Sequence, residues 1–273
     1  MPLLSSYGSA STRGFGQFSA SQGPSLPELP ITTNLLSWHA ADYAPSLTSS
    51  SGRVSQWDDL SGNGNHLYQS TGSLQPSIST LGSMDALSFG SRQYCMYYSS
   101  EITFNAHTIF LAMTINEAVS SSSTPNDILY PVASNVSEGG LRIGGNFSAA
   151  FSGEVSTWWH FSSNNFRING YANTTTRASG FLYIMSLNWN NSSTAQFRVS
   201  NSALSLTTAS STGGYTGGGF DSANSPKNIK FIGGRGVSTP ALNGIIGEII
   251  VYNSALTSGQ VDSVYSYLSE RWS

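Results

Sequence analysis

Charged residues are scarce in this chain of 273 residues, since Asp, Glu, Lys and Arg make up only 9% of it. An average soluble domain carries about a quarter. The net charge is −3, and the only lysines are Lys227 and Lys230. Because binding a phosphate backbone requires clustered basic side chains, the composition argues against nucleic acid as a partner. It predicts a surface that is polar but mostly uncharged.

Cysteine and long apolar runs are nearly absent as well. The single cysteine, Cys95, leaves no disulfide framework or CxxC metal knuckle, so we predict a small buried hydrophobe. The apolar run at 244–252 is far shorter than the ~20 residues of a membrane helix and carries Glu248. It is predicted to be a core strand, with no membrane insertion. The N-terminus lacks the apolar core of a secretory signal, so synthesis in the cytoplasm is expected.

Short runs of alternating or β-branched and aromatic residues, separated by Gly, Asn and Ser clusters, dominate the chain from residue 31 onward. This pattern is typical of many strands around one core, and 243 residues suit one large sandwich. We therefore predict an all-β, two-sheet antiparallel sandwich as a single domain over residues 31–273. The expected strands are 34–40, 53–57, 85–89, 107–115, 128–133, 157–161, 181–189, 195–200, 228–234 and 244–253.

A helix is predicted only at the C-terminus. Thr257 and Gln260 have the spacing of a capping box, and Leu256 with Val261 has that of a hydrophobic staple. The apolar residues that recur at helical spacing, and should pack on the sandwich, are Val261, Val264, Leu268 and Trp272.

Residues 1–30 differ from the rest, being rich in Ser, Gly and Pro and ending in SLPELP. Prolines resist both helix and sheet interior, so an extended N-terminal arm is predicted. The arm is either a disordered tail or a segment that becomes ordered by docking on another chain. The residues expected to anchor it are Leu3, Leu4, Tyr7, Phe15 and Phe18.

The stretch WDDLSGNGNH at 57–66 contains the most suggestive polar motif. Asp59, Ser61, Asn63 and Asn65 imitate the first half of a calcium loop, where oxygen ligands precede a glycine. The second half fails, because Ser70 stands where a bidentate glutamate is needed. The favoured interpretation is a tight turn in which glycine and asparagine adopt positive φ and an aspartate binds loop amides. No cofactor is expected, and Ca²⁺ remains the alternative.

The stretch LLSWHAADYAPSLTSSSGRVSQWDDLSGNGNHLYQST, the strand HTIFLAMTI and the ending GEIIVYNSALTSGQVDSVYSYLSERW together resemble concanavalin A-like jelly-roll domains of the laminin-G type. The resemblance covers about residues 34–273. It implies two stacked antiparallel sheets closed by a short C-terminal helix, in a family whose members in bacteria and phages include modules that bind carbohydrate or protein surfaces. MPLLSSYGSASTRGFG is similar to the N-termini of virion structural and tail-fibre-like proteins of phages.

Glucanases share this fold, and their catalysis requires a pair of carboxylates. Their carboxylates lie on one strand in an E-x-D-x-x-E pattern, which is absent here. Adjacent Asp58 and Asp59 would point to opposite faces of a strand, and Glu248 lacks a partner acid. The four histidines, His39, His66, His107 and His160, show no paired-ligand spacing. These patterns predict a protein that is not an enzyme.

Carbohydrate binding is the stronger candidate among the chemical functions. Sugar rings stack on aromatic faces while amides and hydroxyls meet their hydroxyl groups. Tyr215, in a glycine-rich loop, and Trp158 or Trp159 are the aromatic residues predicted to be displayed. The alternative is that both tryptophans pack internally or at a subunit contact.

The resulting prediction is a non-enzymatic phage virion structural protein, displayed on the particle surface as a head decoration or tail-fibre appendage. It would contact other virion proteins through residues 1–30 and form a homo-oligomer, by phage analogy a trimer. The alternative is an adhesin that binds host-surface glycans. A glycoside hydrolase is disfavoured by the missing acid pair.

Overall fold

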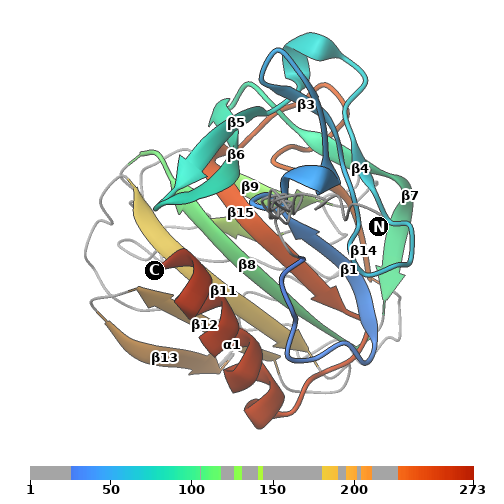
Figure 1. Cartoon of the computed structure of the whole chain (residues 1–273). Coiled ribbons are helices and arrows are strands. Elements are labelled where there is room, and N and C mark those ends of the chain that lie inside the picture. Colours follow the sequence, from blue (N-terminus) through green and yellow to red (C-terminus); the bar gives the residue numbers. More distant parts are fainter. Residues whose placement is uncertain are drawn as a thin grey trace, which may run out of the picture.

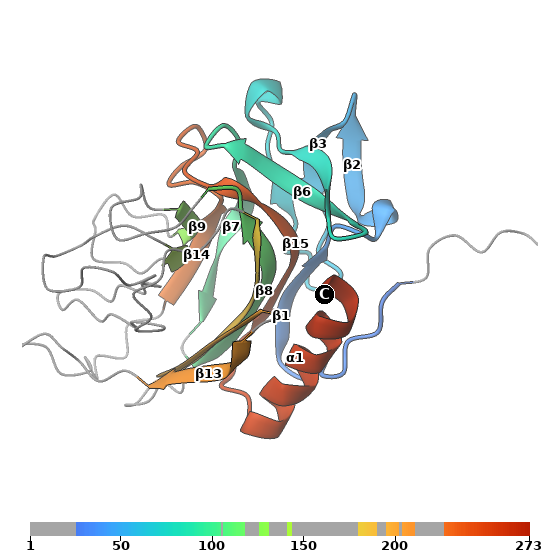
Figure 2. The same ribbon diagram turned by 90° about the vertical axis from the view of Figure 1, so that its left-hand side faces the viewer.

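The computed structural model describes residues 26–104, 106–117, 126–130, 141–143, 180–189, 195–201, 204–210 and 227–273 (Figure 1). Within these residues, fifteen strands join into one antiparallel sheet that curls until its two ends face each other. The curl makes two layers around one core, with the helix α1 (Ser258–Trp272) outside one of them (Figure 2).

The layer beneath the helix is built on β8 and β15, which pair along most of their length. Its strands are β1 (Leu35–Ala40), β8 (His107–Ile115), β11 (Phe181–Trp189), β12 (Ala195–Asn201), β13 (Leu204–Ser210) and β15 (Asn243–Tyr252). The facing layer contains β4 (Leu67–Tyr68), β7 (Met96–Phe104), β9 (Asn126–Tyr130), β10 (Leu141–Ile143) and β14 (Lys227–Ile232). The strands β2 (Leu47–Ser50), β3 (Arg53–Trp57), β5 (Ser77–Leu81) and β6 (Met84–Ser91) connect the two layers.

The central strand β8 shows why the sequence has runs that do not alternate. It is buried along its whole length. Ile109 and Leu111 belong to the core between the layers, whereas Phe110 and Ala112 belong to the cluster under the helix. Because both faces of the strand are covered, both sets of side chains are apolar.

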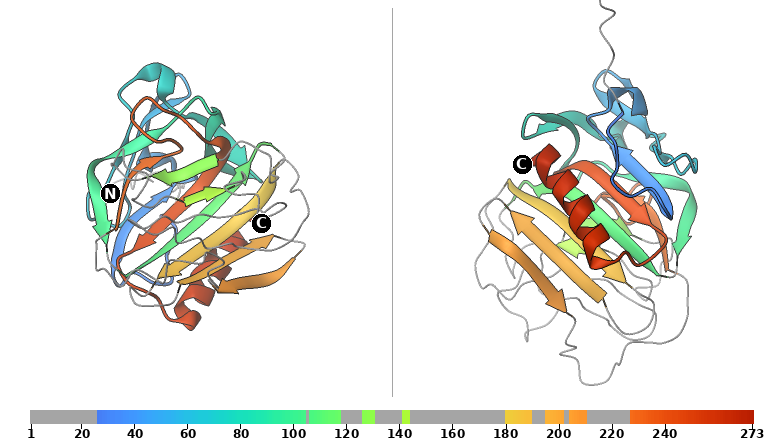
Figure 3. Two further views of the ribbon diagram at one scale, coloured as in Figure 1. Left: turned by 180° about the vertical axis from the view of Figure 1, so that it is seen from behind. Right: turned by 60° about the horizontal axis from the view of Figure 1, so that its bottom comes forward.

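The helix α1 lies across β8, β11 and β12, as the right-hand view of Figure 3 shows. The predicted capping box is present, since the Thr257 side chain accepts from the Gln260 amide and the Gln260 side chain accepts from the Thr257 amide at 2.9 Å. The predicted apolar stripe is buried as well, and consists of Val261, Val264, Leu268 and Trp272. The Trp272 ring packs directly on the sheet at Gly247, where it occupies the space that a Cβ would need.

The all-β fold class and the single C-terminal helix are thus confirmed, with the two layers continuous at one edge rather than separate. Cys95 is buried, and burial raises the pKa of its thiol to about 11. The strands not among those expected are β2, β4, β5, β7, β10 and β13. The expected strand at 157–161 lies outside the described residues. No helix of the described residues is long and apolar enough to cross a bilayer.

Candidate functional site

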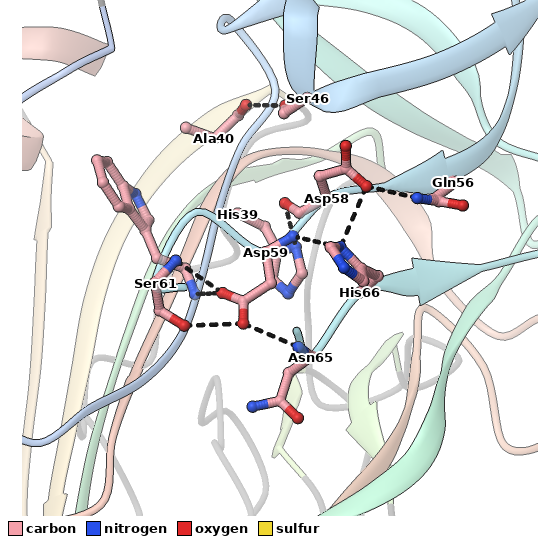
Figure 4. A network of polar contacts seen from close by, with 10 residues as sticks. His39, Ala40, Ser46, Gln56, Asp58, Asp59, Ser61, Asn65 and His66 are labelled. Carbon is pink, nitrogen blue, oxygen red and sulfur yellow. Dashed lines mark hydrogen bonds and ion pairs between the residues drawn. The ribbon is translucent and has the colours of Figure 1, made fainter. Parts of the chain in front are cut away.

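The loop after β3 is organised by the carboxylate of Asp59, which is only 7% exposed. Its Oδ1 accepts from the backbone amides of Trp38 and Ser61, both at 2.9 Å. Its Oδ2 accepts from the Ser61 hydroxyl at 2.8 Å and the Asn65 amide at 2.9 Å (Figure 4). Four donors thus converge on one carboxylate, and the loop is tied to β1.

The two loop asparagines extend this attachment. The Asn63 side-chain amide donates to the Leu35 carbonyl, and that of Asn65 donates to the Leu36 carbonyl, each at 2.8 Å. The glycine before each asparagine adopts positive φ, 86° and 75° respectively, a conformation that favours glycine. The alternation of Gly and Asn therefore makes tight turns and ties them to β1.

The four residues with calcium-loop spacing, Asp59, Ser61, Asn63 and Asn65, do lie in one loop. A calcium site needs their oxygens to converge on an ion. Here both Asp59 oxygens accept hydrogen bonds from within the protein, and both asparagines direct amide nitrogens at carbonyls. The contacts favour the turn interpretation. In the described part of the chain, no group of three or more His, Cys, Asp or Glu is placed to hold a metal ion.

The outward side of the same loop carries a different cluster, formed by Gln56, Asp58, His66 and Tyr68. Asp58 Oδ1 accepts from the Gln56 side-chain amide and lies 3.1 Å from His66 Nδ1. The His66 ring meets the Tyr68 ring edge to face, with centroids 6.2 Å apart. The side chains of His66 and Asp58 are 32% and 33% exposed. This cluster, which we call the outer cluster, offers a ligand a carboxylate, an imidazole, an amide and an aromatic ring.

Strand alternation places the outer cluster away from the core. Trp57 and Leu67 are fully buried between the layers, while Gln56 and Tyr68 are partly exposed and lie directly opposite each other in the β3–β4 pair. Successive side chains of a strand point to opposite faces, and directly opposed residues share a face. Gln56 and Tyr68 therefore lie together on the outer face of the sheet.

Behind the loop, His39 is fully buried against the rings of Trp57 and Tyr98. Its Nδ1 lies 3.0 Å from the Asp58 carbonyl, so this nitrogen carries the proton when the ring is neutral. Nε2 is buried without a hydrogen-bond partner among the described residues. Burial lowers the pKa of His39 to about 4, against an opposing effect of the Asp59 charge.

This pKa predicts a stability change in mild acid. The unfolded chain binds a proton at His39 near pH 6.5 and the folded chain only near pH 4, so the contribution of neutral His39 is fully present above pH 6.5. It is lost as the pH falls toward 4, at a cost of about 3 kcal/mol. Urea unfolding of wild type and His39→Gln at pH 7.5 and pH 4.5 checks this. The wild type should lose more stability than the variant, and equal losses would contradict the assignment.

A second buried cluster joins β1, β15 and α1 around Glu248, which is fully buried. Glu248 Oε1 accepts from the Trp38 indole at 2.7 Å and the Tyr267 hydroxyl at 2.8 Å. Oε2 accepts from the Trp272 indole at 2.8 Å and lies 3.4 Å from Arg271 Nε. Burial raises the pKa of Glu248, against the opposing effects of Arg271 and the three donors. With its oxygens so engaged and no exposed surface, this carboxylate holds the helix on the sheet.

A groove of about 700 Å³ lies between residues 26–35 and the loop tip. Its lining includes Trp38, Ser61 and Asn63. The Trp38 indole donates to Glu248, the Asn63 amide donates to Leu35, and the Ser61 hydroxyl donates to Asp59. Trp38 is also only 4% exposed, so the groove lacks the partly exposed ring that Tyr68 gives the outer cluster.

The remaining predicted site residues lie outside the described residues. These are the aromatic candidates Tyr215, Trp158 and Trp159 and the arm residues Leu3, Leu4, Tyr7, Phe15 and Phe18. Gln56 and Tyr68 were not among the site residues predicted from the sequence. The sequence signal that could have found them is strand alternation. Gln56 precedes the apolar Trp57 and Tyr68 follows the apolar Leu67, so both are expected on the outer face.

Comparison with known proteins finds similarity in structure only. No protein-family model matches the chain, and no curated protein matches it in sequence. A GH54 α-L-arabinofuranosidase soaked with a cyclic sulfate inhibitor matches with a TM-score of 0.56 and 15% identity, over 81% of this chain and 51% of that chain. An arabinofuranosidase complexed with arabinofuranosyl-α-1,2-xylobiose also has a TM-score of 0.56, with 14% identity and the same coverage. This chain thus spans about half the length of these enzymes.

Another match covers a whole domain. Domain 4 of AbnA, a GH43 extracellular arabinanase from Geobacillus stearothermophilus, was solved in complex with arabinotriose. It matches with a TM-score of 0.52 and 14% identity, over 85% of this chain and 98% of that domain. At such identities the likeness shows the fold alone.

These comparisons contradict two predictions: that the chain is a non-enzymatic structural protein of a phage particle, and that it is not an enzyme. The matching proteins are glycosidases or a domain of one, and these comparisons give no support to a protein of a phage particle. The virion prediction depended on a short leader of low complexity. The enzyme prediction depended on the absence of a single-strand acid pattern, but carboxylates on different strands of a sandwich can meet without any such pattern.

Proposed function

We propose that this chain is a carbohydrate-recognising β-sandwich of a carbohydrate-active protein, and that the outer cluster contacts the glycan. The cluster is the observation that carries the proposal. A partly exposed Tyr68 ring offers a face for a sugar ring, and Asp58, His66 and Gln56 lie beside it with groups that hydrogen-bond to hydroxyls.

The ligand class is a neutral oligosaccharide, for which arabinotriose is the first probe. The domain that this chain matches over 98% of its length is described in complex with arabinotriose. The low content of charged residues also suits an uncharged, hydroxyl-rich ligand better than an anionic polymer.

Isothermal titration of the full chain with arabinotriose tests the proposal. Tyr68→Ala and Asp58→Asn should each weaken binding by about tenfold, the equivalent of 1.4 kcal/mol. Tyr265→Ala, on the helix over the other layer, is the matched control and should leave affinity unchanged. Release of reducing ends in the same samples reports whether bound glycan is also cleaved. Absence of binding to neutral oligosaccharides, or equal affinities for Tyr68→Ala and the control, would contradict the proposal.

A further inference from the structure

A row of aromatic residues crosses the outer face of the sheet, starting at the outer cluster. Tyr68 of β4 lies directly opposite Tyr97 of β7. Tyr97 lies opposite Phe231 of β14, and Phe231 lies opposite Tyr130 of β9. Directly opposed residues of antiparallel strands share one face and have neighbouring Cβ atoms. The register therefore places four rings side by side, across the strands rather than along one of them.

The residues next to this row show which face it occupies. Leu67, Met96, Tyr98, Leu129 and Ile232 are all buried in the core between the layers. Since four of them adjoin Tyr68, Tyr97 and Phe231 along their strands, those three rings point away from that core. The register with Phe231 places Tyr130 on the same face, although Ile128 of β9 is buried in the core cluster together with Leu129. The helix α1 covers the opposite layer (Figure 2).

Exposure and chemistry distinguish the row from an ordinary packing ladder. Tyr68, Tyr97 and Tyr130 are partly exposed, whereas Phe231 between them is buried. Cross-strand aromatic pairs stabilise a sheet wherever they occur. Three of these four rings, however, carry a hydroxyl, and one end of the row meets the carboxylate, imidazole and amide of the outer cluster. Rings bordered by hydrogen-bonding groups are the lining expected of a sugar site.

We propose that Tyr97 and Tyr130, with Phe231 packed between them, extend the site begun at Tyr68, so that it binds a linear, neutral oligosaccharide lying across the strands. This inference rests on the proposed function. Three steps between neighbouring strands span about 14 Å, a length suited to several linked sugars rather than one. Asp58 at one end of the row disfavours a negatively charged sugar there.

A length series tests the inference on the full chain. Isothermal titration with arabinose, arabinobiose, arabinotriose and arabinotetraose should show affinity rising at least about tenfold from the monosaccharide to the trisaccharide. Tyr97→Ala should abolish most of this gain while changing monosaccharide affinity less than about twofold, and Tyr97→Phe, which keeps the ring, should retain it. Tyr130→Ala, at the far end, should affect only the longer sugars. Trigalacturonic acid should bind at least about tenfold more weakly than arabinotriose.

The contrary outcomes separate the two proposals. Equal affinity for arabinose and arabinotriose, an undiminished length gain in Tyr97→Ala, or binding of trigalacturonic acid as tight as that of arabinotriose would overturn the inference while the proposed function stands. A failure of every sugar to bind the wild type would overturn both. Melting curves of Tyr97→Phe and Tyr97→Ala beside the wild type show whether a lost gain reflects a lost ring or a lost fold.

Discussion

Replacing Glu248 with glutamine is expected to lower the free energy of unfolding by about 3–5 kcal/mol. The carboxylate is fully buried and accepts from two indoles and a tyrosine hydroxyl. A glutamine offers one acceptor oxygen and turns an NH₂ group toward donors on the other side, so at least one buried donor loses its partner. Arg271 also loses a counter-charge, although it keeps its pairing with Asp42.

Urea denaturation of Glu248→Gln at neutral pH measures this loss. The matched control is Glu270→Gln, an exposed glutamate of the same helix, which should change stability by less than about 0.5 kcal/mol. Detachment of α1 should also show as a change in tryptophan fluorescence, because Trp38 and Trp272 both contact the carboxylate. Equal stability of the two variants would mean that the cluster does not hold the helix in place.

The second large effect is expected at Asp59. Asp59→Asn keeps the size of the side chain but replaces one acceptor oxygen with a donor, facing groups that are themselves donors. The expected cost is about 2–4 kcal/mol, because hydrogen bonds to a charged, nearly buried group are lost and backbone amides are left unpaired.

Thermal melting of Asp59→Asn against Asp85→Asn, an exposed aspartate in β6, checks this expectation. Since Asp58 and His66 belong to the same loop, glycan affinity should fall together with stability in Asp59→Asn. Addition of Ca²⁺ distinguishes the two interpretations of the loop. The turn interpretation predicts the same melting temperature of the wild type with and without Ca²⁺, whereas a rise that is absent in Asp59→Asn would favour an ion site.

Much of the architecture was predictable because it depends on local pattern. The capping box of Thr257 and Gln260 and the apolar stripe through Trp272 follow from spacing on a helix. The strands β3, β8 and β11 were predicted with their observed bounds, since β-branched and aromatic residues are enriched in strands. β7 was not among the expected strands, because the polar residues of MYYSSEITF interrupt its apolar pattern.

The outer cluster and the aromatic row were not predictable in the same way. Tyr68, Tyr97, Tyr130 and Phe231 lie far apart in sequence and become neighbours only through the register of four strands. No local pattern specifies which strands pair. The sequence did suggest that glycan binding would use aromatics. The residues it nominated were Tyr215, in a glycine-rich segment, and Trp158 and Trp159, in the strand expected at 157–161, and all three lie outside the described residues.

Asp59 illustrates the remaining ambiguity of a motif. In the sequence, alternating oxygen-bearing residues and glycines are compatible with both a calcium loop and a tight turn. The hydrogen bonds favour the turn, since the side-chain nitrogens of Asn63 and Asn65 hold the loop against the carbonyls of β1. These hydrogen bonds depend on β1, which lies more than twenty residues away in sequence.

A structure determined from crystals of the chain soaked with arabinotriose tests most directly the claim that the outer face of β4 and β7 binds glycan. The account predicts sugar rings against Tyr68 and Tyr97, with a hydroxyl group within hydrogen-bonding distance of Asp58. Density for the trisaccharide in the groove beside Trp38, or anywhere other than the outer face of β4 and β7, would contradict it.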